Sequence, residues 1–197
     1  GTGRELLHTV GARGFGERAG WDWNIEAAWQ WGSFGAANIS AWTVSIDAGF
    51  EFAALPFAPR IGLKADAISG DRNRNDRQLG TFNPLFPKLP YFSEANLATP
   101  ANLLDVQPGL SLSLTDRLSA AVSWNRLWKH ENADAFYAPL LTPVAGTSLS
   151  QSRDIGSQTS MLVSWQATRQ LDLGATYVVF VPRTDIRQAG GRAGRFL

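Results

Sequence analysis

The stretch WDWNIEAAWQW, residues 21–31, has an apolar side chain at nearly every second position. Its tryptophans and Ile25 share one parity, and Asp22, Asn24, Glu26 and Gln30 lie on the other. A repeat of two residues is that of a β-strand, whose successive side chains point to opposite faces. We therefore expect a strand with one apolar and one polar face, and the environment of the tryptophans decides the fold.

The same alternation recurs along the whole chain. Strands are expected at residues 5–13, 21–31, 42–52, 60–67, 104–115, 118–129, 160–167 and 171–181, with a ninth beginning at 195. Most are about ten residues long, more than the ~5–6 usual in soluble sheets and close to the ~9–11 of a tilted membrane strand. No segment shows convincing helical periodicity. Because lipid tolerates strands only in a closed sheet, the pattern predicts an all-β fold, an antiparallel transmembrane β-barrel.

Two kinds of connection alternate between these strands. Short turns are expected at residues 53–59, 115–117 and 168–170, and long loops at 70–103, 130–156 and 182–194. In bacterial outer-membrane barrels the short turns are periplasmic and the long loops extracellular. We therefore expect a protein of the bacterial outer membrane, embedded in the lipid bilayer, with its long loops outside the cell.

Composition excludes several functional classes. The net charge of +1, without a long basic block, argues against a nucleic-acid partner. With no cysteine and two distant histidines, neither a metal site nor a cofactor is expected, and no catalytic motif indicates an enzyme. The 197 residues suit a single domain, residues 1–197. The first residues, GTGRELLHTV, look like a cut inside a longer chain.

Two other folds would also alternate. A soluble β-sandwich buries one face of each strand, but its strands are shorter and its core seldom needs so many tryptophans. A sugar-binding sheet could present four tryptophans of the opening stretch as a stacking platform. The apolar parity persists in strands without tryptophan, such as residues 60–67, which favours the membrane barrel.

Residues 65–91, ADAISGDRNRNDRQLGTFNPLFPKLPY, resemble the alginate export family of outer-membrane barrels. The resemblance lies in a strand that ends in Ser-Gly-Asp and in the following TFNPLFP segment, residues 81–87. Residues 177–197 are similar to the family's penultimate strand, its exit loop and the start of its last strand. The resemblance implies a barrel of about eighteen strands that exports an anionic exopolysaccharide, alginate-like, through a charged lumen. This chain would be its C-terminal half, truncated at both ends, with eight to nine strands, and periplasmic export components would be partners.

Basic residues are the candidate substrate-binding groups, because guanidinium and ammonium groups attract the carboxylates of a polyanion. Three cluster in the first long loop: Arg72, Arg74 and Arg77. Four have the parity of the polar face: Arg13, Arg60, Lys64 and Lys129. Acids of the same parity outnumber them: Asp22, Glu26, Asp47, Glu51, Asp66, Asp105 and Asp172. Cross-strand ion pairs that stiffen the wall are therefore an alternative role for these bases.

Three further points stay open at this stage. Arg126 has the parity of the apolar face, and we expect it to reach the lipid headgroups. The segment TFNPLFPKLPYF, residues 81–92, could fold into the pore as a constriction or cover its mouth as a cap. A substrate-selective porin for small molecules is the alternative to a polysaccharide channel.

Overall fold

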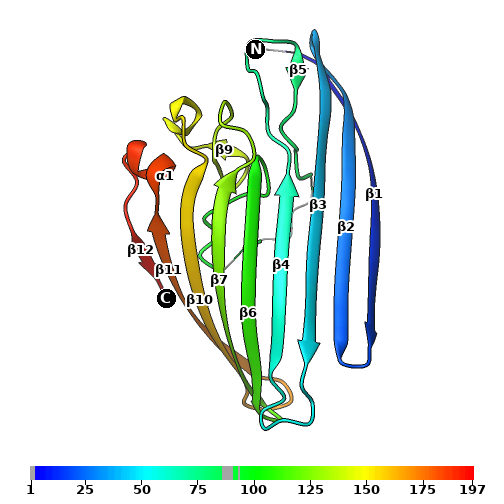
Figure 1. The fold of residues 1–197 in the computed structure, drawn as a ribbon, viewed down its shortest axis with the longest axis vertical. Coiled ribbons are helices and arrows are strands. Elements are labelled where there is room, and N and C mark those ends of the chain that lie inside the picture. The colour runs from blue at the N-terminus through cyan, green and yellow to red at the C-terminus, as the bar shows by residue number, and fades with distance from the viewer. Residues whose placement is uncertain (1–2, 86–90, 93) are drawn as a thin grey trace.

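The computed structural model describes residues 3–85, 91–92 and 94–197, which form one wide sheet of long antiparallel strands (Figure 1). The long strands follow one another in chain order across the sheet. They are β1 (Glu5–Arg18), β2 (Trp21–Phe34), β3 (Ala37–Glu51), β4 (Arg60–Ile68), β6 (Leu103–Thr115), β7 (Leu118–Lys129), β10 (Asp154–Gln166), β11 (Asp172–Pro182) and the short β12 (Gly194–Phe196). Two-residue β5 (Gln78–Leu79) pairs parallel with the start of β3. The eight expected strands and the beginning of a ninth are confirmed.

Several strands extend beyond the ends that the sequence predicts for them. β2 and β3 meet at a tight turn at Gly35, so β3 begins five residues before Trp42. Gly35 has a φ of 59°, a left-handed conformation that glycine adopts without steric cost. This turn lies at the same end of the sheet as the long loops (Figure 1), so the long-loop end also carries one short connection. The sequence signal was weak because SFGAAN lacks a strong turn dipeptide.

One face of the sheet is apolar and uncovered by any described residue. Directly paired residues share a face, so Ile46 continues the row of Ile25 on one side and Ala65 on the other. This apolar face includes the exposed side chains of Trp21, Trp23, Ile25, Trp29, Trp31, Trp42, Val44, Ile46, Ile61, Leu63, Val106, Leu110, Val122, Trp124, Met161, Val163, Trp165, Leu173 and Tyr177. A contiguous apolar surface of this extent on a folded protein marks a contact with membrane or partner.

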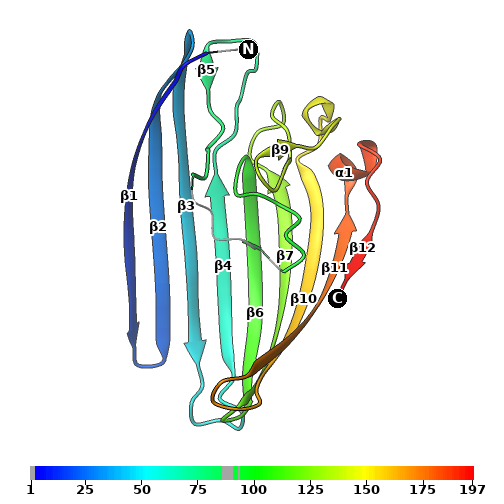
Figure 2. The ribbon, with the colours of Figure 1, turned by 180° about the vertical axis from the view of Figure 1, so that it is seen from behind.

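The other face, the polar face, is partly covered by the long loops at one end of the strands. There a hydrophobic cluster joins the wall to the loops; it includes Ile68, Leu103, Leu127, Ile155 and Phe180 from the strands and Phe82, Phe92, Phe136 and Ile186 from the loops. Figure 2 shows the loops lying across the sheet on this side, while the lower strands curl toward the same side. The hydrophobic core therefore lies between the polar face of the sheet and the long loops, and not on the apolar face that carries the tryptophans.

Two short helical turns differ from the expectation that the chain has no helix. A 3₁₀ turn spans Thr147–Leu149, and α1 (Thr184–Gln188) follows β11 directly. Each is about one turn long, too short to produce a periodic pattern in the sequence. Among the described residues, no helix is long and apolar enough to cross a membrane. The 130–153 loop also holds a small hairpin of β8 (Tyr137–Ala138) and β9 (Thr142–Pro143).

Candidate functional site

The polar face carries a ladder of ion pairs between neighbouring strands. On β1, the Arg13 Nε lies 3.1 Å from the Glu26 carboxylate and donates a hydrogen bond of 2.7 Å to the Asn24 side chain. On β4, the Arg60 Nε donates to Asp22 at 2.7 Å, and its Nη2 lies 3.5 Å from Asp47. Arg60 thus joins β2, β3 and β4, so Arg13 and Arg60 both form the cross-strand ion pairs that the sequence offered as an alternative role.

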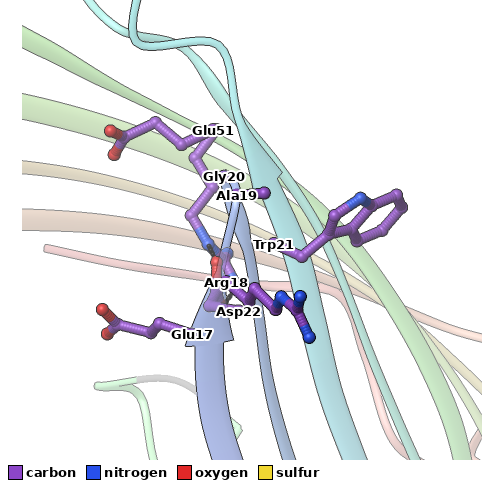
Figure 3. Close-up of a pocket in the computed structure, with 8 residues that line it drawn as sticks. Glu17, Arg18, Ala19, Gly20, Trp21, Asp22 and Glu51 are labelled. Carbon is purple, nitrogen blue, oxygen red and sulfur yellow. Dashed lines mark hydrogen bonds and ion pairs between the residues drawn. The ribbon is translucent and has the colours of Figure 1, made fainter.

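The turn end of this face is open and rich in acids. A hollow of about 560 Å³ is lined by Glu17, Arg18, Ala19, Gly20, Trp21, Asp22, Glu51 and Arg60. Figure 3 shows the Glu17 and Glu51 carboxylates directed to one side, whereas the Trp21 ring is directed to the other. The carboxylates belong to the polar face and the indole to the apolar face. Within this hollow the three acids therefore outnumber Arg60, the one polar-face base that lines it.

Lys64 lies deeper, beneath the first long loop. Its Nζ is 3.6 Å from Asp66 on the same strand and 3.9 Å from the centre of the Tyr91 ring. The Tyr91 hydroxyl donates to Asp66 at 3.0 Å. Lys64 also donates to the Tyr91 backbone carbonyl at 3.4 Å. Tyr91, a loop residue that the sequence did not single out, is therefore fixed to the polar face by its hydrogen bond to the Asp66 carboxylate and by the cation–π contact with Lys64.

A second contact fixes the same loop farther along the wall. Gln30 on β2 is buried; its amide donates to the Asn83 carbonyl at 2.6 Å and accepts from the Asn83 N–H at 2.8 Å. This two-point contact ties the start of the segment at residues 81–92 to the wall, as Tyr91 ties its end. The described ends of the segment lie on the polar face, and residues 86–90 and 93 lie outside the described residues.

Lys129 is placed differently from the other three polar-face bases. Its side chain has no exposed surface and lies 3.1 Å from Asp185 of α1, which is equally buried. The ammonium also donates to the carbonyls of Thr147 at 2.6 Å, Asn132 at 3.1 Å and Asp134 at 3.4 Å. Lys129 therefore holds two loops to the end of β7, and a dissolved solute has no access to it.

The three loop arginines lie at the long-loop end of the sheet, on exposed backbone between β4 and β5. The Arg72 side chain is 88% exposed and its Nε lies 3.6 Å from Glu131. The loop beneath is ordered by Asp134, which accepts hydrogen bonds from the Asp71 N–H and the Thr81 hydroxyl. Partial burial raises the pKa of Asp71. The arginines are thus presented to solvent from a braced loop.

The sequence predicts that Arg126 reaches the lipid headgroups, but its guanidinium is instead bound to neighbouring protein groups. Its guanidinium donates to the Gly156 carbonyl at 2.7 Å, pairs with Asp154 and lies 5.0 Å from the centre of the Trp128 ring. The neighbouring strand β10 has a bulge between Asp154 and Gly156, which brings the carboxylate to the guanidinium. The acid was not visible as a partner in the sequence because a bulge shifts the register.

Comparisons with known proteins identify a family and a solved structure to which this chain is similar. The sequence model of the family described as alginate export matches residues 1–197. Among solved structures, the chain is similar to the outer membrane channel DcaP of Acinetobacter baumannii, with a TM-score of 0.55 and 13% sequence identity. The match covers 97% of this chain and 50% of that chain, so this chain spans about half the length of its structural neighbour. No curated protein matches the sequence.

The match to DcaP shows the fold alone, that of an outer-membrane barrel, in whose wall an apolar face contacts lipid and a polar face lines the lumen. The open sheet is part of a barrel wall. The chain belongs to the alginate export family, and its sheet has the fold of part of the barrel wall of an outer membrane channel.

Proposed function

We propose that the channel passively conducts an anionic, alginate-like exopolysaccharide out of the cell. The observation that carries this proposal is the pairing of Arg13 and Arg60 with carboxylates on the lumenal, polar face. A uronate carboxylate can take the place of a wall carboxylate at a guanidinium, because both form the same charge-assisted hydrogen bonds. Because a uronate carboxylate only replaces a wall carboxylate at the guanidinium, the polymer is bound weakly and can advance to the next site.

The arrangement along the lumen supports passage rather than capture. Each base has an acid beside it, so the polymer meets attraction and repulsion in alternation and no position holds it tightly. Arg72, Arg74 and Arg77 would meet the polymer at the other mouth, within about a Debye length (~8 Å in physiological salt). In this proposal the long loops are extracellular, the short turns are periplasmic, and periplasmic export components deliver the polymer at the turn end.

A second candidate is a selective porin for small molecules. Two observations favour it: lumenal acids outnumber lumenal bases, and Tyr91 of the first long loop lies on the lumenal surface. A passage narrowed in this way with excess negative charge would suit small neutral or cationic solutes. The two candidates therefore predict opposite responses to the charge of an added oligosaccharide.

Single-channel current through the reconstituted full-length protein separates them. For the exporter, oligouronates block the current at low salt, and neutral oligosaccharides of equal length block less. Replacing both Arg13 and Arg60 with Gln should weaken the oligouronate block, since the guanidinium partners are gone. The matched control is Arg18→Gln, which removes a base of the opposite parity near the same end and should leave the block unchanged. A block by neutral oligomers that equals or exceeds the block by oligouronates would favour the porin.

A further inference from the structure

The apolar face has a hollow on its first three strands, β1, β2 and β3. Its volume is about 500 Å³, and the side chains that line it include Val10, Ala12, Ala27, Trp29, Trp42 and Val44. The small Ala12 and Ala27 are directly paired, and the paired Trp29 and Trp42 border them on the long-loop side. Because these side chains are apolar, the hollow suits a hydrocarbon chain better than a dissolved solute.

A cluster of aromatic and charged groups lies next to this hollow at the long-loop end. The Trp42 ring meets the His130 ring edge-on, with 5.3 Å between the ring centres. Burial lowers the pKa of His130, which directly follows β7, so at neutral pH the ring packs as an uncharged aromatic group. The Glu131 carboxylate lies 3.6 Å from His130 Nδ1, 3.6 Å from Arg72 Nε and 3.5 Å from Arg153 Nη2. The Trp42–His130 pair therefore connects the hollow to two guanidinium groups.

The cluster carries one net positive charge, because the single carboxylate of Glu131 is shared by two guanidinium groups. The Glu131 side chain is only 12% exposed, whereas those of Arg72 and Arg153 are 88% and 50% exposed. The bases, and not the acid, are therefore presented to the surroundings. Guanidinium groups bind phosphate through short, paired hydrogen bonds, so a phosphate group is a suitable partner for this pair of arginines.

An amphiphile with an apolar chain and an anionic head matches both parts of this surface. The hollow opens on the apolar face, which in a barrel wall contacts lipid, so a membrane lipid reaches it and a lumenal solute does not. We propose that the long-loop end of the apolar face binds one phosphate-bearing lipid, with an acyl chain in the hollow and the phosphate at Arg72 and Arg153. Trp29 and Trp42 then lie near the headgroups, as interfacial aromatic residues do.

The two arginines come from different connections of the chain. Arg72 lies between β4 and β5, and Arg153 directly precedes β10. One phosphate bound by both therefore ties two of the long connections to the membrane surface. The site selects an anionic lipid over a neutral one, because a neutral headgroup leaves the net positive charge of the cluster without a partner.

The test is native mass spectrometry of the full-length protein in detergent, with phosphatidic acid and phosphatidylcholine of equal chain length as probes. We expect the wild-type protein to retain one phosphatidic acid in preference to phosphatidylcholine. Replacing both Arg72 and Arg153 with Gln should weaken phosphatidic acid binding about tenfold, because each base beside an anionic lipid contributes several-fold. The matched control replaces Arg187 and Arg192, two exposed arginines between β11 and β12, with Gln and should retain the preference.

A second variant tests the hollow without changing any charge. Ala27→Leu fills the hollow with an apolar side chain on the lipid-facing side, so the barrel should stay folded while phosphatidic acid binds more weakly. Its control is Ala120→Leu, the same change on the apolar face of β7, where Ala120 is paired with Val163 outside the hollow. This control should bind phosphatidic acid as the wild-type protein does.

Equal affinity for the two lipids, or an unchanged affinity for phosphatidic acid in the Arg72 and Arg153 double variant, would overturn the proposal. Inorganic phosphate is the last probe. If it displaces phosphatidic acid and Ala27→Leu has no effect, the arginines bind a free anion from water and the lipid site is refuted. None of these readouts involves the transported solute, so the lipid site and the proposed substrate succeed or fail separately.

Discussion

Ile46 and its neighbour Ser45 face different surroundings although one peptide bond joins them. Ile46 lies in the middle of β3 on the lipid-facing side, between Ile25 and Ala65. Ile46→Lys should lower the free energy of unfolding by about 2–4 kcal/mol, because a charge near the bilayer midplane is poorly solvated. The measurement is denaturant unfolding of the reconstituted barrel.

The control for this change is Glu26→Lys, because Glu26 lies at the same depth on β2 but faces the lumen and is half exposed. It should cost less than Ile46→Lys, about 1 kcal/mol, since an exposed ion pair with Arg13 becomes an exposed like-charge pair in water. Ser45 is a poorer control because it lies beside the Tyr91 hydroxyl. Equal losses from Ile46→Lys and Glu26→Lys would indicate that both faces pack against protein.

For single residues, the sequence predicts which face of the sheet a side chain lies on, but not how deeply the side chain is buried. Arg13, Arg60 and Lys64 were correctly assigned to the polar face, because a period of two places side chains without knowledge of other segments. The burial of Lys129 could not be foreseen in the same way. It depends on Asp185, a residue of a distant loop whose position only the folded chain defines.

At the scale of elements, the first long loop is held to the wall at two points, Gln30–Asn83 and Asp66–Tyr91. Gln30→Ala removes both hydrogen bonds to Asn83 and should increase the motion of the start of the segment at residues 81–92. A spin label at the exposed Leu85 measures this motion. Thr9→Ala, which alters the residue paired with Gln30 on β1, is the control. A label equally mobile in the parent and in Gln30→Ala would show that the contact does not hold the loop.

Strands and loops differed in how well the sequence predicted them. Alternation identified every long strand, because each strand repeats its own signal over ten or more residues. The loop's path could not be read in this way. It is set by single contacts such as Gln30 with the Asn83 backbone, and a backbone partner carries no sequence signature. The sequence therefore leaves both arrangements of the segment, constriction and cap, open, and its described ends lie on the polar face.

At the scale of the whole molecule, the proposed function gives the mouth arginines a role that depends on salt. Replacing Arg72, Arg74 and Arg77 together with Gln should weaken capture of oligouronates at low salt. The effect should shrink at high salt, where screening already suppresses the attraction. Three changes are needed because each exposed contact contributes little, under ~1 kcal/mol. Inhibition of single-channel current by oligouronates is the measurement, and an unchanged block at low salt would remove these arginines from the mechanism.

The central claim is that one face of the sheet contacts lipid and the other lines a water-filled channel. The chain has no cysteine, so single cysteines can be placed one at a time along β3, from position 42 to 47, in the full-length protein in membranes. A charged, water-soluble thiol reagent should react at positions 43, 45 and 47 and spare 42, 44 and 46. Reaction rates without this alternation, or with the opposite one, would contradict the account.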